Sequence, residues 1–232
     1  MPKKKVSRKK LLKEPDEFIS TTGQVIRFLR THQRQATLAA VVVLIVIAAG
    51  AGTFYYLRSQ EGRALALQQQ GLQLYQDAYR TSQENPAAEK KEDYQKALEK
   101  FKEALSAYSW GRTGQVSQLF IGHCCYALKQ YDPAQEAYSK VLDGPFRDLA
   151  LNGLAYIAEA KGDFQKALEY FQKNMEDPNQ PYYLDSMLGA ARCYEELKQK
   201  AKALEIYQKA LAQAPKSSMA EFMRWKVGEL KG

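Results

Sequence analysis

Cysteine and histidine are scarce in this chain of 232 residues, which holds three cysteines and two histidines. An odd number of cysteines provides no disulfide framework for a compartment outside the cytoplasm. His123, Cys124 and Cys125 are consecutive, and consecutive helical residues point about 100° apart, so their side chains cannot converge on one metal ion. We therefore predict that Cys124, Cys125 and Cys193 are small buried apolar residues and that the chain holds no metal site.

Signatures of catalysis are also missing. The sequence contains no glycine-rich phosphate loop, and no pair of carboxylates stands out from the ordinary surface charges. Nothing in the spacing indicates a Ser-His-Asp arrangement. These absences predict a protein that is not an enzyme and needs no cofactor.

Charge is absent from one long stretch. Residues 35–57 read QATLAAVVVLIVIAAGAGTFYYL, with no charged side chain between Arg34 and Arg58. A helix of this length spans roughly 35 Å, enough to cross a hydrocarbon core of about 30 Å. A helix also satisfies every backbone polar group within the segment, as lipid requires. We predict one transmembrane helix over residues 35–57.

A cleaved signal peptide is the alternative interpretation of this stretch, because Ala49-Gly50-Ala51 fits a small-residue cleavage pattern. An uncleaved anchor is favoured for two reasons. The leader would be unusually long, and the apolar run continues through Phe54, Tyr55 and Tyr56, which suit a membrane interface. A lipoprotein is not favoured, since the first cysteine is Cys124.

The net charge of +8 is concentrated before the apolar stretch. Residues 1–34 hold ten basic and three acidic side chains, which leaves a net charge of +1 for the rest of the chain. A basic block beside a span follows the positive-inside rule, so we predict a cytoplasmic tail of residues 1–34 and a body of residues 58–232 across the membrane. The same placement argues against nucleic-acid binding, which a basic chain would otherwise suggest.

The tail contains two kinds of segment. Residues 1–13 form a basic run that we expect to be disordered. Residues 15–17 (Pro-Asp-Glu) suit the start of a helix, and apolar residues follow at helical spacing from Phe18 to Leu29. Two interpretations stay open for this helix: it lies on the inner membrane surface as an amphipathic helix, or it is a short solvated helix.

The body beyond the span is repetitive. A helix continuous with the membrane helix is predicted from Arg58 to Glu84, and Asn85-Pro86 ends it. Four later segments share a pattern of an aromatic residue, an alanine three positions on, and an aromatic residue four positions after the alanine; the fourth lacks only the leading aromatic. The repeated alanines, 37, 33 and 36 residues apart, are Ala97, Ala134, Ala167 and Ala203.

This pattern resembles the tetratricopeptide repeat, in which a small residue lies where two paired helices cross and an aromatic residue follows one turn later. The resemblance covers roughly residues 64–216. Gly122 and Ala191 match a further small position twelve residues before the repeat alanine, whereas Asn174 departs from the small apolar residue expected at its position. Stacked repeats bury the apolar faces that one repeat alone cannot bury.

The predicted fold class is all-α: a single N-terminal transmembrane helix followed by a tetratricopeptide-repeat superhelix with a C-terminal capping helix over Met219–Leu230. Gly162-Asp163 is predicted to be a turn within a helix pair, and residues 143–145 and 177–181 are predicted to separate successive pairs.

The resemblance also implies a partner-binding groove, lined by the first helix of each pair. Such a groove holds an extended peptide or a partner helix. An alternative is that these positions are ordinary solvated residues and that contacts lie elsewhere. Carrying the repeat register over position by position places in the groove Leu119, His123, Tyr126, Asn152, Tyr156, Glu159, Leu188, Arg192 and Glu195.

The layout as a whole is similar to the YfgM-like ancillary subunits of the SecYEG translocon. The basic approach to the span, the Tyr55–Arg58 exit from it and the Ser218–Met223 segment carry this resemblance, while the basic run of residues 1–13 departs from it. The resemblance implies an anchor in the bacterial inner membrane with the repeat domain in the periplasm. It also implies that translocon subunits, periplasmic chaperones or emerging chains are the protein partners.

Three functional hypotheses follow. The first is a translocon-associated chaperone scaffold, in which the anchor keeps the groove close to emerging chains so that weak binding suffices. The second is a scaffold for another envelope complex, such as cell division or outer-membrane assembly. The third is an enzyme whose site the sequence does not reveal, which only turnover by the purified domain would support.

Overall fold

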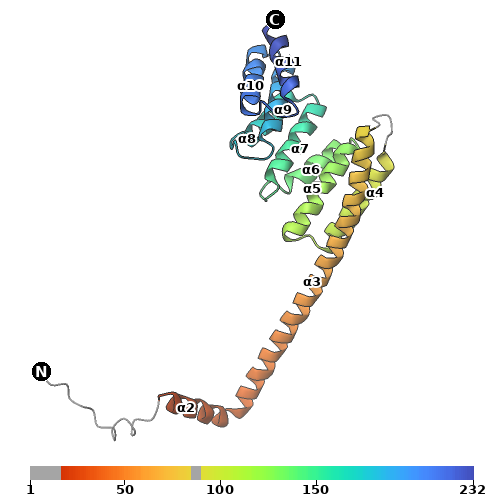
Figure 1. Cartoon of the computed structure of the whole chain (residues 1–232). Coiled ribbons are helices and arrows are strands. Elements are labelled where there is room, and N and C mark those ends of the chain that lie inside the picture. The colour runs from red at the N-terminus through yellow and green to blue at the C-terminus, as the bar shows by residue number, and fades with distance from the viewer. Residues whose placement is uncertain (1–16, 85–89) are drawn as a thin grey trace, which may run out of the picture. The chain divides into compact units, whose positions relative to one another are not determined.

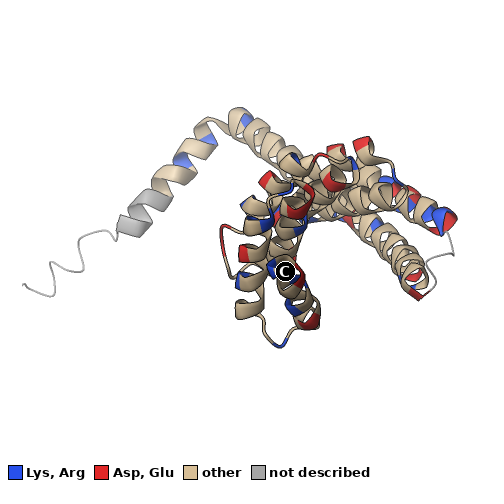
Figure 2. Cartoon of the chain, turned by 90° about the horizontal axis from the view of Figure 1, so that it is seen from above, with Lys and Arg blue, Asp and Glu red and all other residues tan. Residues whose placement is uncertain are grey.

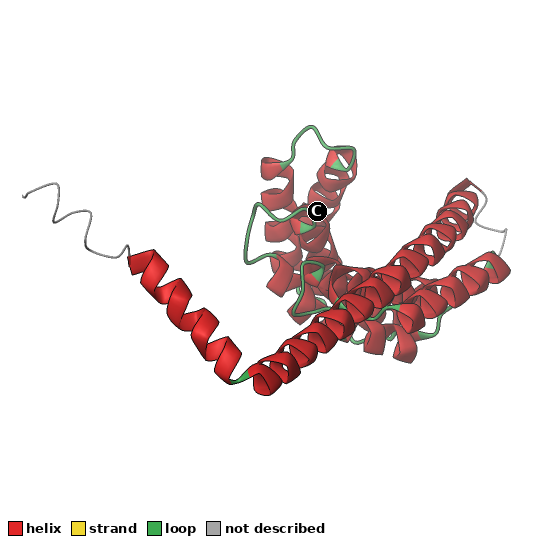
Figure 3. Cartoon of the chain, turned by 90° about the horizontal axis from the view of Figure 1, so that it is seen from below, coloured by secondary structure: helices red, strands yellow, loops and turns green. Residues whose placement is uncertain are grey.

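The computed structural model describes residues 17–84 and 90–232. The basic run of residues 1–13, the Pro15-Asp16 helix start and the Asn85-Pro86 helix end lie outside these residues. In the described part every regular element is a helix and no strand occurs (Figure 3). The helices in chain order are α2 (Glu17–Thr31), α3 (Gln33–Glu84), α4 (Lys91–Ala107), α5 (Gly111–Ala127), α6 (Tyr131–Ser139), α7 (Arg147–Ala160), α8 (Phe164–Asn174), α9 (Tyr183–Glu196), α10 (Lys200–Gln213) and α11 (Ala220–Lys231) (Figure 1).

The chain divides into two compact units, residues 1–57 and residues 58–232. The first unit contains α2 and the apolar part of α3. The most apolar 18-residue window of α3 has a mean hydropathy of 2.4, and none of it is buried. By length and composition α3 is therefore a candidate membrane span. The helix continues without a break to Glu84, as the sequence predicts.

The second unit is a stack of helix pairs. The part of α3 that belongs to this unit packs against α4, and Gly71 of α3 lies against the Phe101 ring of α4. The next pairs are α5 with α6, α7 with α8 and α9 with α10, and each pair contacts the one that follows. The last helix, α11, packs against α10 as the capping helix predicted from the sequence. This arrangement confirms the tetratricopeptide-repeat architecture.

The repeated alanines explain how the helices of a pair approach each other. Each of the four lies on the second helix of its pair and is 0% exposed. A methyl side chain at a helix crossing allows close contact of the backbones, and the aromatic residue one turn later fills the space beside it. These aromatic residues are almost wholly buried, and they are Phe101, Tyr138, Phe171 and Tyr207.

Glycines on the first helices receive these aromatic rings. The Tyr138 ring lies between Gly122 of its own pair and Gly153 of the next pair. A Cβ atom added to Gly122 would be 2.6 Å from Tyr138 Cε1, and one added to Gly153 would be 2.4 Å from Tyr138 Cζ. The Phe171 ring packs in the same way against Gly189, where an added Cβ would be 2.3 Å from Cζ. Each of these two aromatic rings therefore packs against a glycine of the following pair and joins consecutive pairs.

We expect Gly153→Ala to destabilise the second unit by about 1–3 kcal/mol, because the Tyr138 ring is enclosed from both sides and cannot move away. In an exposed helix the same change stabilises by up to about 1 kcal/mol. Gly228→Ala in α11 is the matched control, since no atom lies within 4 Å of an added Cβ there. Urea unfolding of residues 58–232 measures both variants. Equal shifts of the unfolding midpoint in the two variants would contradict this packing.

The connections between helices also follow the sequence. Gly162 adopts a φ of 76°, which glycine tolerates without strain, and forms the turn between α7 and α8. The Asp163 carboxylate then accepts a hydrogen bond from the Lys166 backbone N–H and caps α8. Figure 2 shows acidic and basic residues interspersed over the repeat helices, which is the expected surface of a soluble domain.

Buried polar and sulfur-containing residues complete the core. Asn174, the departure from the repeat pattern, is buried, and its Nδ2 donates a hydrogen bond to the Asp148 backbone oxygen. The three cysteines are free and buried, as predicted. Burial raises the pKa of Cys124 to about 12, so its thiol stays protonated at neutral pH.

Candidate partner-binding groove

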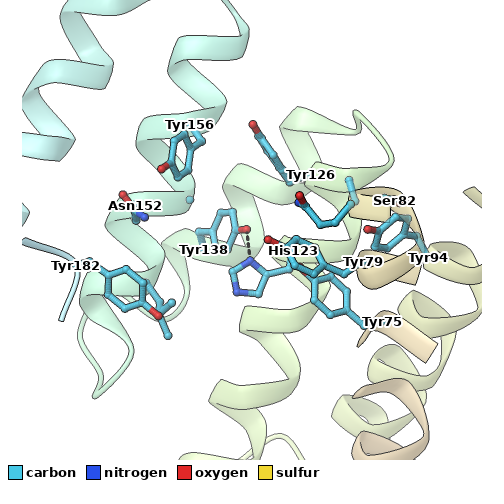
Figure 4. Close-up of a pocket in the computed structure, with 14 residues that line it drawn as sticks. Tyr75, Tyr79, Ser82, Tyr94, His123, Tyr126, Tyr138, Asn152, Tyr156 and Tyr182 are labelled. Atoms are coloured by element: carbon cyan, nitrogen blue, oxygen red, sulfur yellow. Dashed lines mark hydrogen bonds between the residues drawn. The ribbon is translucent and has the colours of Figure 1, made fainter. Parts of the chain in front are cut away.

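A cavity of about 390 Å³ opens between the first three helix pairs of the second unit (Figure 4). We call it the tyrosine groove, because seven tyrosines line it, together with His123 and several small or polar residues. None of the residues that line it carries a formal charge at neutral pH. The tyrosines are Tyr75, Tyr79, Tyr94, Tyr126, Tyr138, Tyr156 and Tyr182.

His123 and Tyr138 form the base of the tyrosine groove. The Tyr138 hydroxyl lies 2.7 Å from His123 Nδ1, and this hydrogen bond is the dashed line in Figure 4. The Tyr75 ring lies beside the imidazole, with ring centroids 6.1 Å apart. Burial lowers the pKa of His123 to about 4, so the imidazole is neutral at physiological pH. Burial also raises the pKa of Tyr138, which stays protonated.

Asp185 binds the two polar residues that α7 contributes to the groove. Its Oδ2 accepts hydrogen bonds from Asn152 Nδ2 at 2.7 Å and from the Tyr156 hydroxyl at 2.8 Å. Because Asp185 belongs to α9, these bonds fix two groove residues against the following helix pair. Burial raises the pKa of Tyr156, and the negative charge of Asp185 beside the hydroxyl raises it further.

Three further charged residues, Glu159, Arg192 and Glu195, lie beside the groove, and each has a partner of opposite charge. Arg192 donates two hydrogen bonds to the Glu159 carboxylate, from Nε at 3.2 Å and from Nη2 at 2.9 Å. The Arg192 guanidinium also lies over the Tyr156 ring, 5.9 Å from its centroid, within the roughly 6 Å reach of a cation–π contact. Glu195 accepts hydrogen bonds from the Tyr207 hydroxyl and Lys226 Nζ. A paired charge of this kind is poorly placed to bind a ligand's charge.

The structure brings four of the nine groove residues predicted from the sequence into one site. His123, Tyr126, Asn152 and Tyr156 all line the tyrosine groove. Glu159, Arg192 and Glu195 lie beyond it in the pairs just described. Contact of a partner protein with these four residues or with the three charged ones stays a prediction.

Leu119 and Leu188 require a correction. They are 2% and 5% exposed and belong to two of the core clusters, so neither presents a surface to a ligand. Leu119 lies one turn before His123 on α5, where the helix faces the packed core and not the cavity.

Sequence reasoning missed five of the seven tyrosines. Tyr75 and Tyr79 belong to α3. The alanine–aromatic pattern marks only the second helix of each pair, so it does not identify α3 as the first helix of a repeat. Tyr138 is recognisable as the repeat aromatic, but its access to a cavity is not. The signal in the sequence that could have indicated them is its tyrosine content, since the chain has 15 tyrosines.

Among the described residues no group of histidine, cysteine, aspartate or glutamate side chains is arranged to hold a metal ion.

Comparisons with known proteins agree with this fold. Residues 146–216 match the tetratricopeptide repeat family. The uncharacterized protein ycf37 of Cyanophora paradoxa is 30% identical over 98 residues, which are 40% of this chain and 56% of that protein. This chain thus spans about half the length of that curated relative.

Two solved structures of other proteins are similar to this chain at low sequence identity. Kinesin light chain TPR-like repeats from Podosopora anserina are 20% identical, with a TM-score of 0.50 over 75% of this chain and 84% of that one. YrrB, described as a TPR protein with an unusual peptide-binding site, is 22% identical, with a TM-score of 0.48 over 58% of this chain and 67% of that one.

Residues 146–216 match the tetratricopeptide repeat family, and the helix pairs of the second unit have the architecture of this repeat, with a buried alanine and a buried aromatic residue in each second helix. The helix pairs form the stack, and the apolar part of α3 precedes them in the sequence.

Proposed function

We propose that this protein is a non-enzymatic adaptor, anchored in a membrane by residues 35–57, that binds a segment of a partner protein in the tyrosine groove. The observation that carries the proposal is the groove itself. It is a cavity lined by seven tyrosine side chains, held open by the His123–Tyr138 and Asp185 hydrogen bonds. Tyrosine supplies a large apolar contact area and a polar hydroxyl on a side chain with few rotamers.

The lining specifies the chemistry of the bound segment. An uncharged aromatic surface favours apolar and aromatic side chains of a partner, and the tyrosine hydroxyls and Ser82 are available to its backbone. Arg192 beside the groove is paired with Glu159, and the Asp185 carboxylate is itself negative, so recognition of a terminal carboxylate or of a phosphate is not expected. A peptide or helix that inserts two or three apolar side chains fits this surface.

The orientation of the protein is part of the proposal. The basic tail of residues 1–34 is assigned to the cytoplasm by the positive-inside rule, and the repeat domain to the periplasmic side of a bacterial inner membrane. The finer form of the proposal is a chaperone scaffold beside the Sec translocon. This finer form rests on the sequence resemblance alone, and the alternative is a scaffold for another envelope complex.

The test is purification of the tagged full-length protein from native membranes in mild detergent. Tyr79→Arg places a charge in the groove at a side chain that is 51% exposed, so the fold is retained. We expect it to reduce co-purified partner about tenfold, which corresponds to about 1.4 kcal/mol. The matched control is Gln76→Arg, which places the same charge one turn earlier on α3, at an exposed residue that does not line the groove.

Partner capture that is equal in the two variants would exclude the groove as the binding site. A version without residues 1–57 reports whether the anchor is needed. Recovery of translocon subunits with the anchored protein supports the finer form, and a dominant complex of other envelope proteins supports the alternative.

A further inference from the structure

The helix before the apolar stretch, α2, exposes apolar side chains along one face. Val25, Ile26, Phe28 and Leu29 are each between 46% and 62% exposed. Successive helical residues are rotated by about 100°, so Val25, Phe28 and Leu29 lie within an arc of about 100°, and Ile26 borders this arc. A face of this kind is the side that a helix buries against another apolar surface.

The opposite face of α2 is basic. Arg27 and Arg30 are exposed and point about 140–160° away from Val25 around the helix axis. Arg34, which follows the end of α2, is exposed as well. No aspartate or glutamate occurs between Gly23 and Arg34 in the sequence, so these three arginines give the segment a net charge of +3. A helix with one apolar and one basic face is typical of segments that lie on a lipid surface.

Two other environments suit α2 less well. Its 15 residues extend about 22 Å, which is too short to cross a hydrocarbon core of about 30 Å, and a crossing would bury Arg27 and Arg30 in that core. In water an isolated helix of this length is only marginally stable. Within the first unit no other described helix packs against α2 to cover its apolar face. The helix therefore needs an apolar surface that the described part of this unit does not supply.

Continuity of the chain brings a lipid surface to α2. The helix ends at Thr31, whose Oγ1 donates to the Arg27 backbone oxygen at 3.0 Å, and His32 separates it from the start of α3 at Gln33. The proposed span begins at residue 35. Where this span enters a membrane, the short connection keeps α2 next to the headgroups, so weak binding to them suffices.

The charge of the segment selects the kind of lipid. Anionic headgroups attract arginine side chains that lie close to the membrane surface. The long stem of an arginine can also lie along apolar surface while its guanidinium reaches the phosphate level. A leaflet that contains anionic phospholipid thus matches both faces of α2, because its acyl chains suit the apolar side and its phosphates suit the basic side.

We infer that α2 binds the interface of an anionic phospholipid leaflet, with Val25, Phe28 and Leu29 toward the acyl chains and with Arg27 and Arg30 toward the phosphate groups. The inference rests on the proposed membrane anchor for the nearness of lipid. It adds a second contact between the protein and the membrane, and this contact selects lipid by charge, which an uncharged span does not do. The protein is then enriched where anionic lipid is concentrated.

Two positions of α2 that are two residues apart permit a direct test in the full-length protein. Val25→Trp places an indole on the apolar face, and Gly23→Trp places one on the opposite face, where no atom lies within 4 Å of an added Cβ. Trp110→Phe and Trp225→Phe remove the two native tryptophans from both variants. Each protein is reconstituted into vesicles of phosphatidylcholine and phosphatidylglycerol with or without brominated acyl chains, which quench tryptophan fluorescence at short range. We expect brominated lipid to reduce the fluorescence of Val25→Trp about twofold and that of Gly23→Trp much less.

Three outcomes overturn the inference. Quenching of neither indole would show that α2 lies in water, and equal quenching of both would show that lipid surrounds the helix on all sides. Quenching of Val25→Trp that is as strong in phosphatidylcholine alone would show that the arginines do not select anionic lipid. Alkaline extraction tests the anchor separately. Release of the protein by alkali, together with unequal quenching of the two indoles at neutral pH, would refute the anchor and support binding of α2 to lipid.

Discussion

A Phe171→Ala variant of residues 58–232 is expected to unfold with a free energy about 3–5 kcal/mol lower than that of the unchanged domain. Phe171 is fully buried on α8. Its ring contacts Gly189 of α9 and lies edge-on to Tyr156 of α7, with centroids 5.7 Å apart. Truncation therefore leaves a cavity that borders three helices, and neither glycine nor a hydrogen-bonded tyrosine can fill it.

The same substitution is expected to weaken the coupling between repeats, because each pair contacts only its neighbours. Amide hydrogen exchange should become faster in α9, α10 and α11 than in α5 and α6. The control is Trp225→Ala, which truncates an exposed aromatic residue and should change the free energy of unfolding by no more than about 0.5 kcal/mol. Uniform acceleration of exchange over all helices would show that the stack unfolds as one unit, against this expectation.

Acidification is expected to destabilise the domain through His123. Its pKa is lowered to about 4 in the folded protein by burial, against about 6.5 in the unfolded chain. Between these pH values the unfolded chain binds more protons, so the free energy of unfolding falls as the pH falls. The stabilisation is present above the unfolded pKa of about 6.5 and is lost progressively as the pH falls through this value toward 4. We expect a loss of about 1.6 kcal/mol between pH 6.5 and 5.

Urea unfolding at a series of pH values measures this loss. His123 is the single histidine of residues 58–232, since the other one is His32. His123→Gln removes the titrating group and should flatten the dependence between pH 6.5 and 5, whatever it does to the absolute stability. A slope that persists in His123→Gln would assign the effect to carboxylates and contradict the lowered pKa.

The repeat architecture is predictable because its signature is local. The spacing of Ala97, Ala134, Ala167 and Ala203 fixes the register of the second helices, and the aromatic residue one turn after each alanine fixes which side packs inward. The continuity of α3, the Gly162 turn and the capping helix follow from glycine, proline and apolar spacing, and the structure has each of them.

The tyrosine groove is not predictable in the same way, because its walls come from three helix pairs. Tyr79 and Tyr156 meet across the cavity only after the pairs stack, and the angle between pairs depends on contacts such as the Tyr138 ring between Gly122 and Gly153. Leu119 shows the converse. Its repeat position matches a groove residue, but its side chain is buried in a core cluster.

The uncharged lining of the tyrosine groove has a kinetic consequence. A groove without charge does not steer a partner from a distance, so encounters proceed at the ordinary rate of about 10⁵–10⁶ M⁻¹s⁻¹ and change little with ionic strength. Selection among partners then depends on how long each stays bound, which apolar contact determines. A complex at this groove is expected to survive a high-salt wash and to dissociate when the solvent itself becomes less polar.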